Sequence, residues 1–95
     1  MINTITREMT ITHADFFRLL PKALAEYQFR ISGSSIHIKY QSGSVTIQLM
    51  PETSRKIGKL ELPVTHIKFR FEDIEHDQVR EFFDRFDIAY QKGGG

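Results

Sequence analysis

The sequence predicts an α+β fold, in which an antiparallel β-meander of four to five strands carries an N-terminal and a C-terminal helix on one face. Three observations favour this fold. Apolar residues recur at helical spacing near both ends of the chain. They alternate with polar residues through the middle, and short Gly/Ser segments separate the alternating runs. A length of 95 residues is enough for one domain and no more.

The first helix is expected after a weakly structured N-terminal segment over residues 1–11. An apolar series at spacing i, i+3, i+4, i+7 and i+8 indicates one buried helical face within residues 13–25. Thr12 is a suitable N-cap for this helix. Pro21 removes a backbone donor, so we expect a kink or two short helices. The apolar series consists of Phe16, Leu19, Leu20, Ala23 and Leu24.

Three alternating runs follow, and each is typical of a half-buried strand. Apolar residues occupy every second position in each run, and polar residues fill the positions between them. Short segments of Ser and Gly separate the runs, as in an antiparallel meander. The apolar positions are Tyr27, Phe29 and Ile31 in the first run, Ile36, Ile38 and Tyr40 in the second, and Val45, Ile47 and Leu49 in the third.

The next part of the chain is expected to contain a polar loop over residues 51–58 and one or two strands over residues 59–73. The apolar residues of these strands change parity between Val64 and Ile67, so one regular strand cannot place all of them on one face. We therefore expect a bulge or a corner at this point, and Pro63 suits such a position.

A second helix is predicted near the C-terminal end, and a short final strand over residues 87–91 could follow it. A flexible glycine tail is expected over residues 92–95, so the single domain would span residues 12–91. Because each helix has one apolar stripe, the economical packing places both on the same face of the sheet and leaves the other face open. The second stripe consists of Val79, Phe82, Phe83 and Phe86.

The composition excludes several kinds of site. The chain has no cysteine, which excludes a disulfide scaffold, a thiolate zinc site, a cysteine nucleophile and an iron–sulfur cluster. No apolar run reaches the length of a membrane span, and the N-terminus lacks the build of a signal peptide, so a cytoplasmic location without membrane contact is expected. No nucleophile with its base, no metal-ligand set and no cofactor fingerprint is recognisable. We therefore expect no enzymatic activity, no metal and no cofactor.

The charge is unevenly distributed, although the formal net charge is only +1. Residues 28–70 carry seven positive and two negative side chains, whereas residues 71–95 carry three positive and seven negative ones. The polar positions of the predicted strands include no acidic residue, so we expect a cationic open face. Its candidate binding residues are Arg30, His37, Lys39, His66, Lys68 and Arg70.

Such a face favours a small interaction module that binds an acidic protein surface, or that associates with the acidic C-terminal helix of another copy as a homodimer. The alternative is sequence-independent binding of nucleic acid or another anion through the same face. The loop residues Arg55, Lys56 and Lys59 provide a second basic site. Nucleic acid is disfavoured because the aromatic residues fall on the buried parity, where no base can stack on them. An ordinary solvated sheet face would have the same pattern.

Two smaller features also bear on function. His37 and His66 are expected on the open face, where they could be cross-strand neighbours, although two unpaired surface imidazoles are the simpler interpretation. The terminal residues 90–95 resemble the exposed diglycine end of ubiquitin-like sulfur carriers, whose terminal carboxylate is activated by adenylation. This resemblance implies activation at Gly95. The carrier fold begins with a hairpin before its helix, whereas a helix is the first element expected here.

Overall fold

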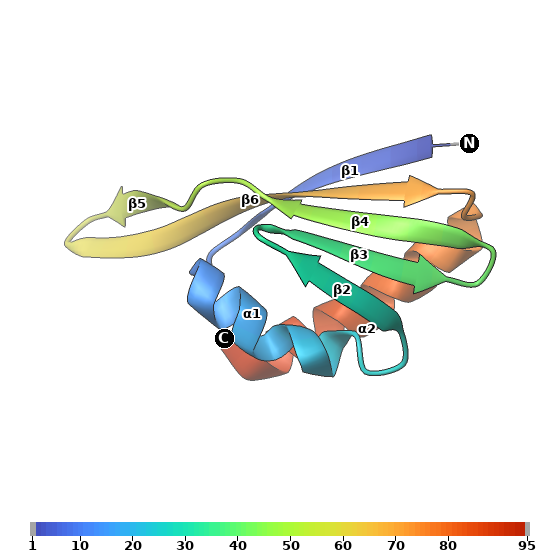
Figure 1. Ribbon diagram of the computed structural model, residues 1–95. Coiled ribbons are helices and arrows are strands. Elements are labelled where there is room, and N and C mark those ends of the chain that lie inside the picture. The colour runs from blue at the N-terminus through green and yellow to red at the C-terminus, as the bar shows by residue number, and fades with distance from the viewer. Residues whose placement is uncertain (1, 95) are drawn as a thin grey trace.

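The structure is a computed structural model that describes residues 2–94 and the side chains of residues 2–91. Two helices cover one face of an antiparallel sheet (Figure 1). The predicted α+β fold class is thereby confirmed. In chain order the elements are β1 (Ile2–Met9), α1 (His13–Ala23), β2 (Gln28–Ser32), β3 (Ser35–Tyr40), β4 (Gly43–Leu49), β5 (Thr53–Ile57), β6 (Leu60–Glu72) and α2 (His76–Gly94).

The N-terminal segment is a strand, so the prediction of weak structure over residues 1–11 is wrong for most of that segment. β1 pairs antiparallel with β6 along its whole length, and the order of the main sheet is β1-β6-β4-β3-β2. Its half-buried positions include the apolar residues Ile5 and Met9, but also Asn3 and Arg7. Because polar residues occupy part of the inward-facing set, the hydrophobic alternation that identifies a strand is weak here.

Helix α1 begins as predicted, since the Thr12 side chain accepts a hydrogen bond from the backbone N of Asp15 at 3.0 Å. It is one helix instead of two short ones. Pro21 lies in its last turn and is exposed, so the missing N–H removes one hydrogen bond near the end of the helix and leaves the rest intact.

Helix α2 is longer than predicted. It includes residues 87–91, for which a strand was expected, because Ala89 and Tyr90 continue the buried helical face. It extends to Gly94 within the segment expected to be a glycine tail, and Gly95 lies outside the described residues. In the part of the chain that is described, neither helix combines the length and the apolar character needed to cross a bilayer.

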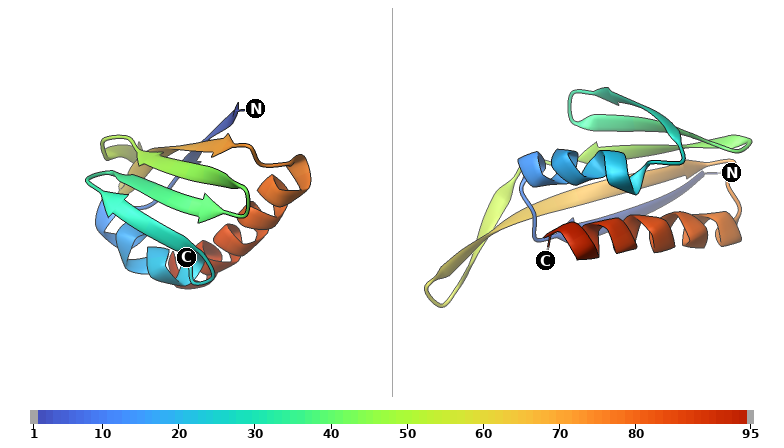
Figure 2. Two further views of the ribbon diagram at one scale, coloured as in Figure 1. Left: turned by 45° about the vertical axis from the view of Figure 1, so that its right-hand side comes forward. Right: turned by 90° about the horizontal axis from the view of Figure 1, so that it is seen from below.

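The core lies between the sheet and both helices, which share it as predicted (Figure 2). The ring of Phe69 from β6 meets the ring of Phe83 from α2 edge to face, with centroids 4.9 Å apart. Phe16 of α1 stacks on Tyr90 of α2 at 5.1 Å. These contacts join the two helices to each other and to one face of the sheet, so the opposite face has no covering layer.

Strand β6 is unbroken over thirteen residues, and the expected irregularity lies in the strand next to it. β4 pairs with β6 as far as Leu49↔Ile67, and β5 continues the pairing from Thr53↔Val64. Four steps along β4 and β5 thus correspond to three steps along β6, which places the extra residue in the connection over residues 50–52. β6 therefore keeps its alternation, and its two apolar sets face opposite sides of the sheet.

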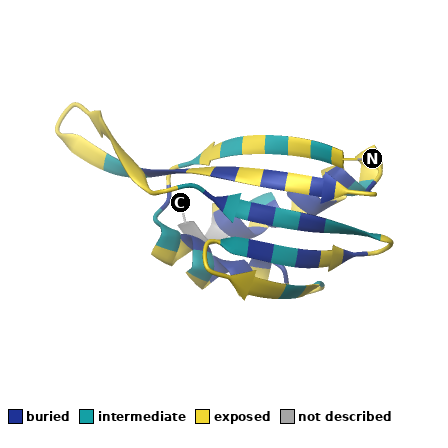
Figure 3. Ribbon diagram, turned by 45° about the horizontal axis from the view of Figure 1, so that its top comes forward, coloured by how far each residue is buried: buried dark blue, intermediate teal, exposed yellow. Residues whose placement is uncertain are grey.

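β5 and the first residues of β6 form a two-stranded arm, residues 53–64, that projects beyond the main sheet (Figure 1). Most of it is exposed (Figure 3). The predicted polar loop over residues 51–58 is therefore wrong, because Thr53–Ile57 is a paired strand. Gly58 adopts a φ of 61° in the two-residue turn at the tip, a conformation that favours glycine.

Two tyrosines of the interior differ in whether their hydroxyl groups form a hydrogen bond. The Tyr90 hydroxyl donates to the backbone O of Phe16 at 2.8 Å. The Tyr27 hydroxyl is buried and makes no hydrogen bond among the described residues. Burial raises the pKa of both phenols, and together with the nearby Tyr40 it raises the pKa of Tyr27 to about 12. Removing each hydroxyl should therefore have a different effect on stability.

We expect Tyr90→Phe to lower the free energy of unfolding by about 1 kcal/mol, because it deletes a satisfied buried hydrogen bond. Tyr27→Phe should leave this free energy unchanged or raise it, because it removes a buried donor that has no partner. Urea denaturation of both variants at pH 7 measures the difference. A greater loss in Tyr27→Phe than in Tyr90→Phe would contradict the assignment.

Gly43 opens β4 where the backbone of the β6–α2 connection approaches closely. A Cβ atom at this position would overlap the backbone O of Glu72 and of Asp73, and neither atom belongs to a flexible side chain. We therefore expect Gly43→Ala to lower the free energy of unfolding by about 1–3 kcal/mol. The matched control is Ser42→Ala at the exposed neighbouring position. Equal stability of the two variants in urea would show that the connection can move aside.

Candidate binding face

The open face of the sheet brings together the residues predicted to bind. Arg30, His37, Thr46 and Arg70 are consecutive cross-strand partners on β2, β3, β4 and β6. Directly opposed residues of an antiparallel pair point to the same face, so these side chains form one line across four strands. With three strand spacings between its ends, this line is about 14 Å long.

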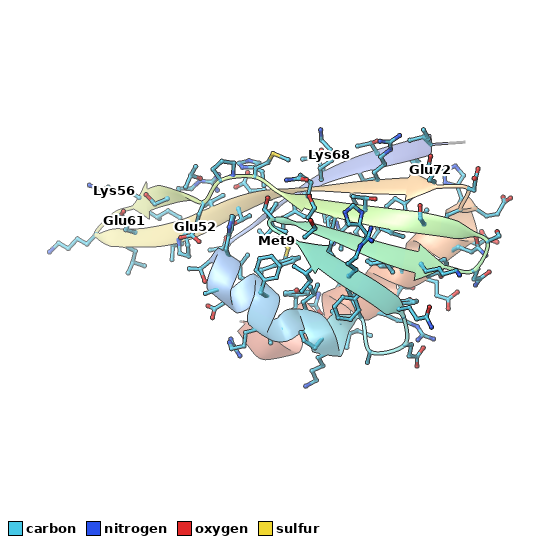
Figure 4. All side chains as sticks on the ribbon, in the orientation of Figure 1. Met9, Glu52, Lys56, Glu61, Lys68 and Glu72 are labelled. Atoms are coloured by element: carbon cyan, nitrogen blue, oxygen red, sulfur yellow. The ribbon has the colours of Figure 1, made fainter. Side chains whose placement is uncertain are left out.

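The other predicted residues lie on either side of this line. Lys39 is two residues from His37 along β3, and Lys68 is two residues from Arg70 along β6. His66 follows two residues beyond Lys68 on the same strand. Figure 4 shows Lys68 on the side of the sheet away from the helices. All six residues therefore share the open face, as predicted, and their role in binding remains a prediction.

The Arg and Lys side chains of this face have no partner within the described part of the chain. None of these four side chains forms an ion pair or a side-chain hydrogen bond, and all four are exposed. Elsewhere, Arg7 pairs with Asp87, and Arg85 pairs with Glu26. The four uncompensated side chains, Arg30, Lys39, Lys68 and Arg70, are called the cationic set below.

The open face also contains two carboxylates, which corrects the prediction of a face without acids. Glu72 ends β6 and lies opposite Ser44 of β4. Glu8 comes from β1, which was not recognised as a strand, and it pairs with Arg55 of the arm. The His66 Nε2 lies 3.4 Å from the second carboxylate oxygen of Glu8. The cationic set still outnumbers these acids, and one of the two acids is already paired.

Two hollows in the open face are lined by residues of the cationic set. The larger, about 380 Å³, has Arg30, His37 and Lys39 in its lining. The smaller, about 230 Å³, is lined by Thr46, Gln48, Lys68 and Arg70. Each hollow has two positive charges and neutral polar side chains in its lining, which suits carboxylate or phosphate oxygens, and the larger one also has the apolar residues Phe29 and Ile38.

The two histidines of the face are not neighbours, because β4 lies between β3 and β6. His37 is level with Arg70 in the register, whereas His66 lies four residues further along β6. Across the residues that the structure describes, no three His, Asp or Glu side chains gather in a way that could hold a metal ion.

The predicted basic loop site is divided between the two faces of the arm. Arg55 pairs with Glu8, so it lies on the side of the open face. Lys56 is the next residue of the strand and so points to the other side, where its cross-strand partner is Glu61. Lys59 belongs to the turn at the tip. These three side chains therefore do not form a single anion site, because strand alternation separates two of them.

The aromatic residues expected on the buried side are found there. Tyr40, Phe69 and Phe71 are 3%, 0% and 1% exposed. The strand positions described on the open face carry hydroxyl, amide, aliphatic, imidazole and charged side chains but no Phe, Tyr or Trp ring. This face therefore lacks the Phe, Tyr or Trp platform on which single-stranded nucleic-acid binders stack successive bases.

Comparison with known protein families finds no match, and comparison with curated proteins finds none of significant similarity. The fold and the face define the class of this protein as a small α+β domain with one helix-covered and one positively charged open sheet face. The carrier resemblance depends on Gly95, which lies outside the described residues. The chain begins with a strand followed by a helix, an order that differs both from the predicted helix-first order and from the hairpin-first carrier fold.

Proposed function

We propose that this protein is a non-catalytic interaction module whose open sheet face binds an acidic protein surface. The observation that carries the proposal is the cationic set, four positive side chains that share one face and have no partner among the side chains that the structure describes. Positive charges gathered on one face repel one another, and an acidic partner relieves this repulsion when it binds. The same charges attract an acidic partner at a distance and speed its association.

The polar residues between the cations support a protein partner. Thr46 lines the smaller hollow, and its hydroxyl can donate a hydrogen bond to a carboxylate or backbone oxygen. An uncovered sheet face accommodates a strand or a helix of a partner lying across several strands. Two copies are not expected to associate face to face, because that arrangement would bring like charges together.

Nucleic acid is the second candidate, and the hollow lined by Lys68 and Arg70 favours it because two cations can hold one phosphate. Without exposed Phe, Tyr or Trp rings, such binding would depend on backbone phosphates and would not depend on sequence. The two candidates therefore predict different preferred ligands under the same conditions.

We expect the protein to bind a fluorescently labelled poly-glutamate peptide at about 50 mM salt and to bind it more weakly at about 300 mM, because salt screens exposed charges. The double variant Lys68→Glu/Arg70→Glu should weaken this binding about tenfold or more. Fluorescence anisotropy measures both effects, and labelled single-stranded and double-stranded DNA are titrated in parallel.

The control for this experiment is Lys22→Glu/Arg80→Glu, which reverses two exposed cations on the helices and changes the net charge equally. Binding by this control should stay within about twofold of that by the unmodified chain. Equal loss of binding in the two double variants would show that only net charge matters. Binding of DNA alone would favour the second candidate. If no probe binds, the proposal is wrong and the open face is an ordinary solvated surface.

A further inference from the structure

Strand β1 is an outer strand of the sheet, and one side of its backbone has no neighbouring strand among the described residues (Figure 1). It pairs with β6 over all eight of its residues and has no bulge. Natural edge strands are often short, bulged or interrupted by Pro or Lys, because an open edge can pair with another chain. β1 has none of these features, and its two charged residues, Arg7 and Glu8, lie near its C-terminal end. This edge is therefore open to an added strand.

The hydrogen-bond pattern shows which backbone groups of β1 face this edge. The N–H of Met50 donates to the backbone O of His66 at 2.9 Å, so the backbone groups of His66 point toward β4 and away from β1. Backbone direction alternates along a strand, so the next residue, Ile67, points toward its partner Arg7 on β1. The even-numbered residues of β1 therefore turn their N–H and C=O groups outward. These residues are Ile2, Thr4, Thr6 and Glu8.

The same residues present their side chains on the open face, because side-chain direction also alternates with a period of two. Thr4 and Thr6 are both exposed there. The register with β6 places Arg70 directly behind Thr4 and Lys68 directly behind Thr6. Because Thr is a short residue, two members of the cationic set lie behind low side chains at this edge.

We propose that the acidic partner adds an extended segment to the β1 edge as an antiparallel strand, with acidic side chains at alternate positions on the open face. This inference rests on the proposed function and specifies how the partner docks. In strand addition, main-chain hydrogen bonds provide affinity and alternate side chains provide specificity. The added strand bonds to the outward backbone groups of Thr4 and Thr6, and the residues opposite these two are acidic.

Charge complementarity determines the chemistry of the added strand. Its residues opposite Thr4 and Thr6 lie two strand spacings, about 10 Å, from the backbone of Arg70 and Lys68. The long flexible stems of Arg and Lys can reach over one Thr toward a Glu side chain. Neither cation has an ion pair within the described part of the chain, so Glu is favoured at both positions. A Lys or Arg there would face like charge.

The helix side of the edge favours an apolar residue between the two acids. Ile5 lies on that side and is half-buried, whereas its partner Phe69 on β6 is 0% exposed. Hollows of about 330 and 230 Å³ adjoin the two ends of β1 and are lined partly by α2, so this helix does not close over the edge. An apolar side chain opposite Ile5 would cover it. The expected pattern of the partner is therefore acidic–apolar–acidic.

The opposite outer strand, β2, is a poorer site and provides the controls. It has five residues, and the same alternation turns only Phe29 and Ile31 outward. Their side chains lie on the helix side, so an added strand would bond to half as many outward residues as on β1.

Amide hydrogen exchange in the presence of a peptide tests the ladder directly. The probe is a seven-residue peptide, Glu-Thr-Glu-Val-Glu-Thr-Glu, blocked at both ends. At saturation it should slow exchange of the Thr4 and Thr6 N–H groups about tenfold or more, because these groups become hydrogen-bonded. The N–H groups of Phe29 and Ile31 should exchange as in the free protein. NMR spectroscopy measures all four rates.

Two N-methylated forms of this peptide separate the ladder from the charge. Methyl groups on the second and third Glu nitrogens point toward β1 and should weaken binding about tenfold or more, because they remove main-chain hydrogen bonds. Methyl groups on the two Thr nitrogens point away from β1 and should leave binding unchanged. The two forms have the same charge and composition, and fluorescence anisotropy measures their affinities.

A protein variant tests the same edge. Thr6→Pro removes an outward N–H and keeps the ladder to β6, so it should fold and bind the peptide about tenfold more weakly or worse. Ile31→Pro makes the matched change on β2 and should bind normally. Circular dichroism establishes that both variants are folded.

Equal binding of the two N-methylated peptides, without protection of Thr4 and Thr6, would overturn strand addition. If Lys68→Glu/Arg70→Glu still lost poly-glutamate binding in that case, the proposed function would stand and only the docking mode would be wrong. If no acidic peptide binds, both proposals are wrong. A chain that sediments as a dimer, and as a monomer after Thr6→Pro, would assign the β1 edge to a second copy instead.

Discussion

The alternation of side chains along β6 is the constraint on which the rest of the structure depends. This strand pairs with β1 on one side and with β4 and β5 on the other, so it joins both ends of the sheet to the arm. Its odd-numbered residues hold the aromatic rings against α2, and its even-numbered residues present Lys68 and Arg70 to solvent. A shift of one residue would exchange these sets, which would bury charge and expose phenylalanine.

Much of the fold could be predicted from hydrophobic periodicity. The three central strands and the two helices were recognisable because their apolar residues recur at regular spacing. β1 was missed because Asn3 and Arg7 occupy inward-facing positions, where Arg7 lies over the ring of Phe83 at 3.9 Å. That ring and Asp87 satisfy the guanidinium through tertiary contacts, and such contacts leave no mark in the local pattern.

The candidate face could be predicted in part, because it follows from the alternation of side chains along each recognised strand. Strand parity placed all six residues on one side, but Glu8 was missed together with β1. The arm was missed because residues 51–58 were interpreted as a polar loop and the parity change after Val64 as a bulge or a corner. The extra residue lies instead in the connection between β4 and β5, which is the neighbouring side of the sheet. Leu60 and Leu62 lie on the exposed arm, on the opposite face from Phe69 and Phe71. Only the register between strands distinguishes these two explanations.

The pairing of β1 with β6 has a consequence for the way the chain folds. It joins Ile2 to Glu72, whereas the hairpins from β2 to β4 join residues only a few positions apart. Local pairs close quickly, and pairs that are distant along the chain close late because the intervening loop loses more entropy. We therefore expect β1 to enter the sheet after the local hairpins have formed, and until then one edge of β6 would be open to pairing with other chains.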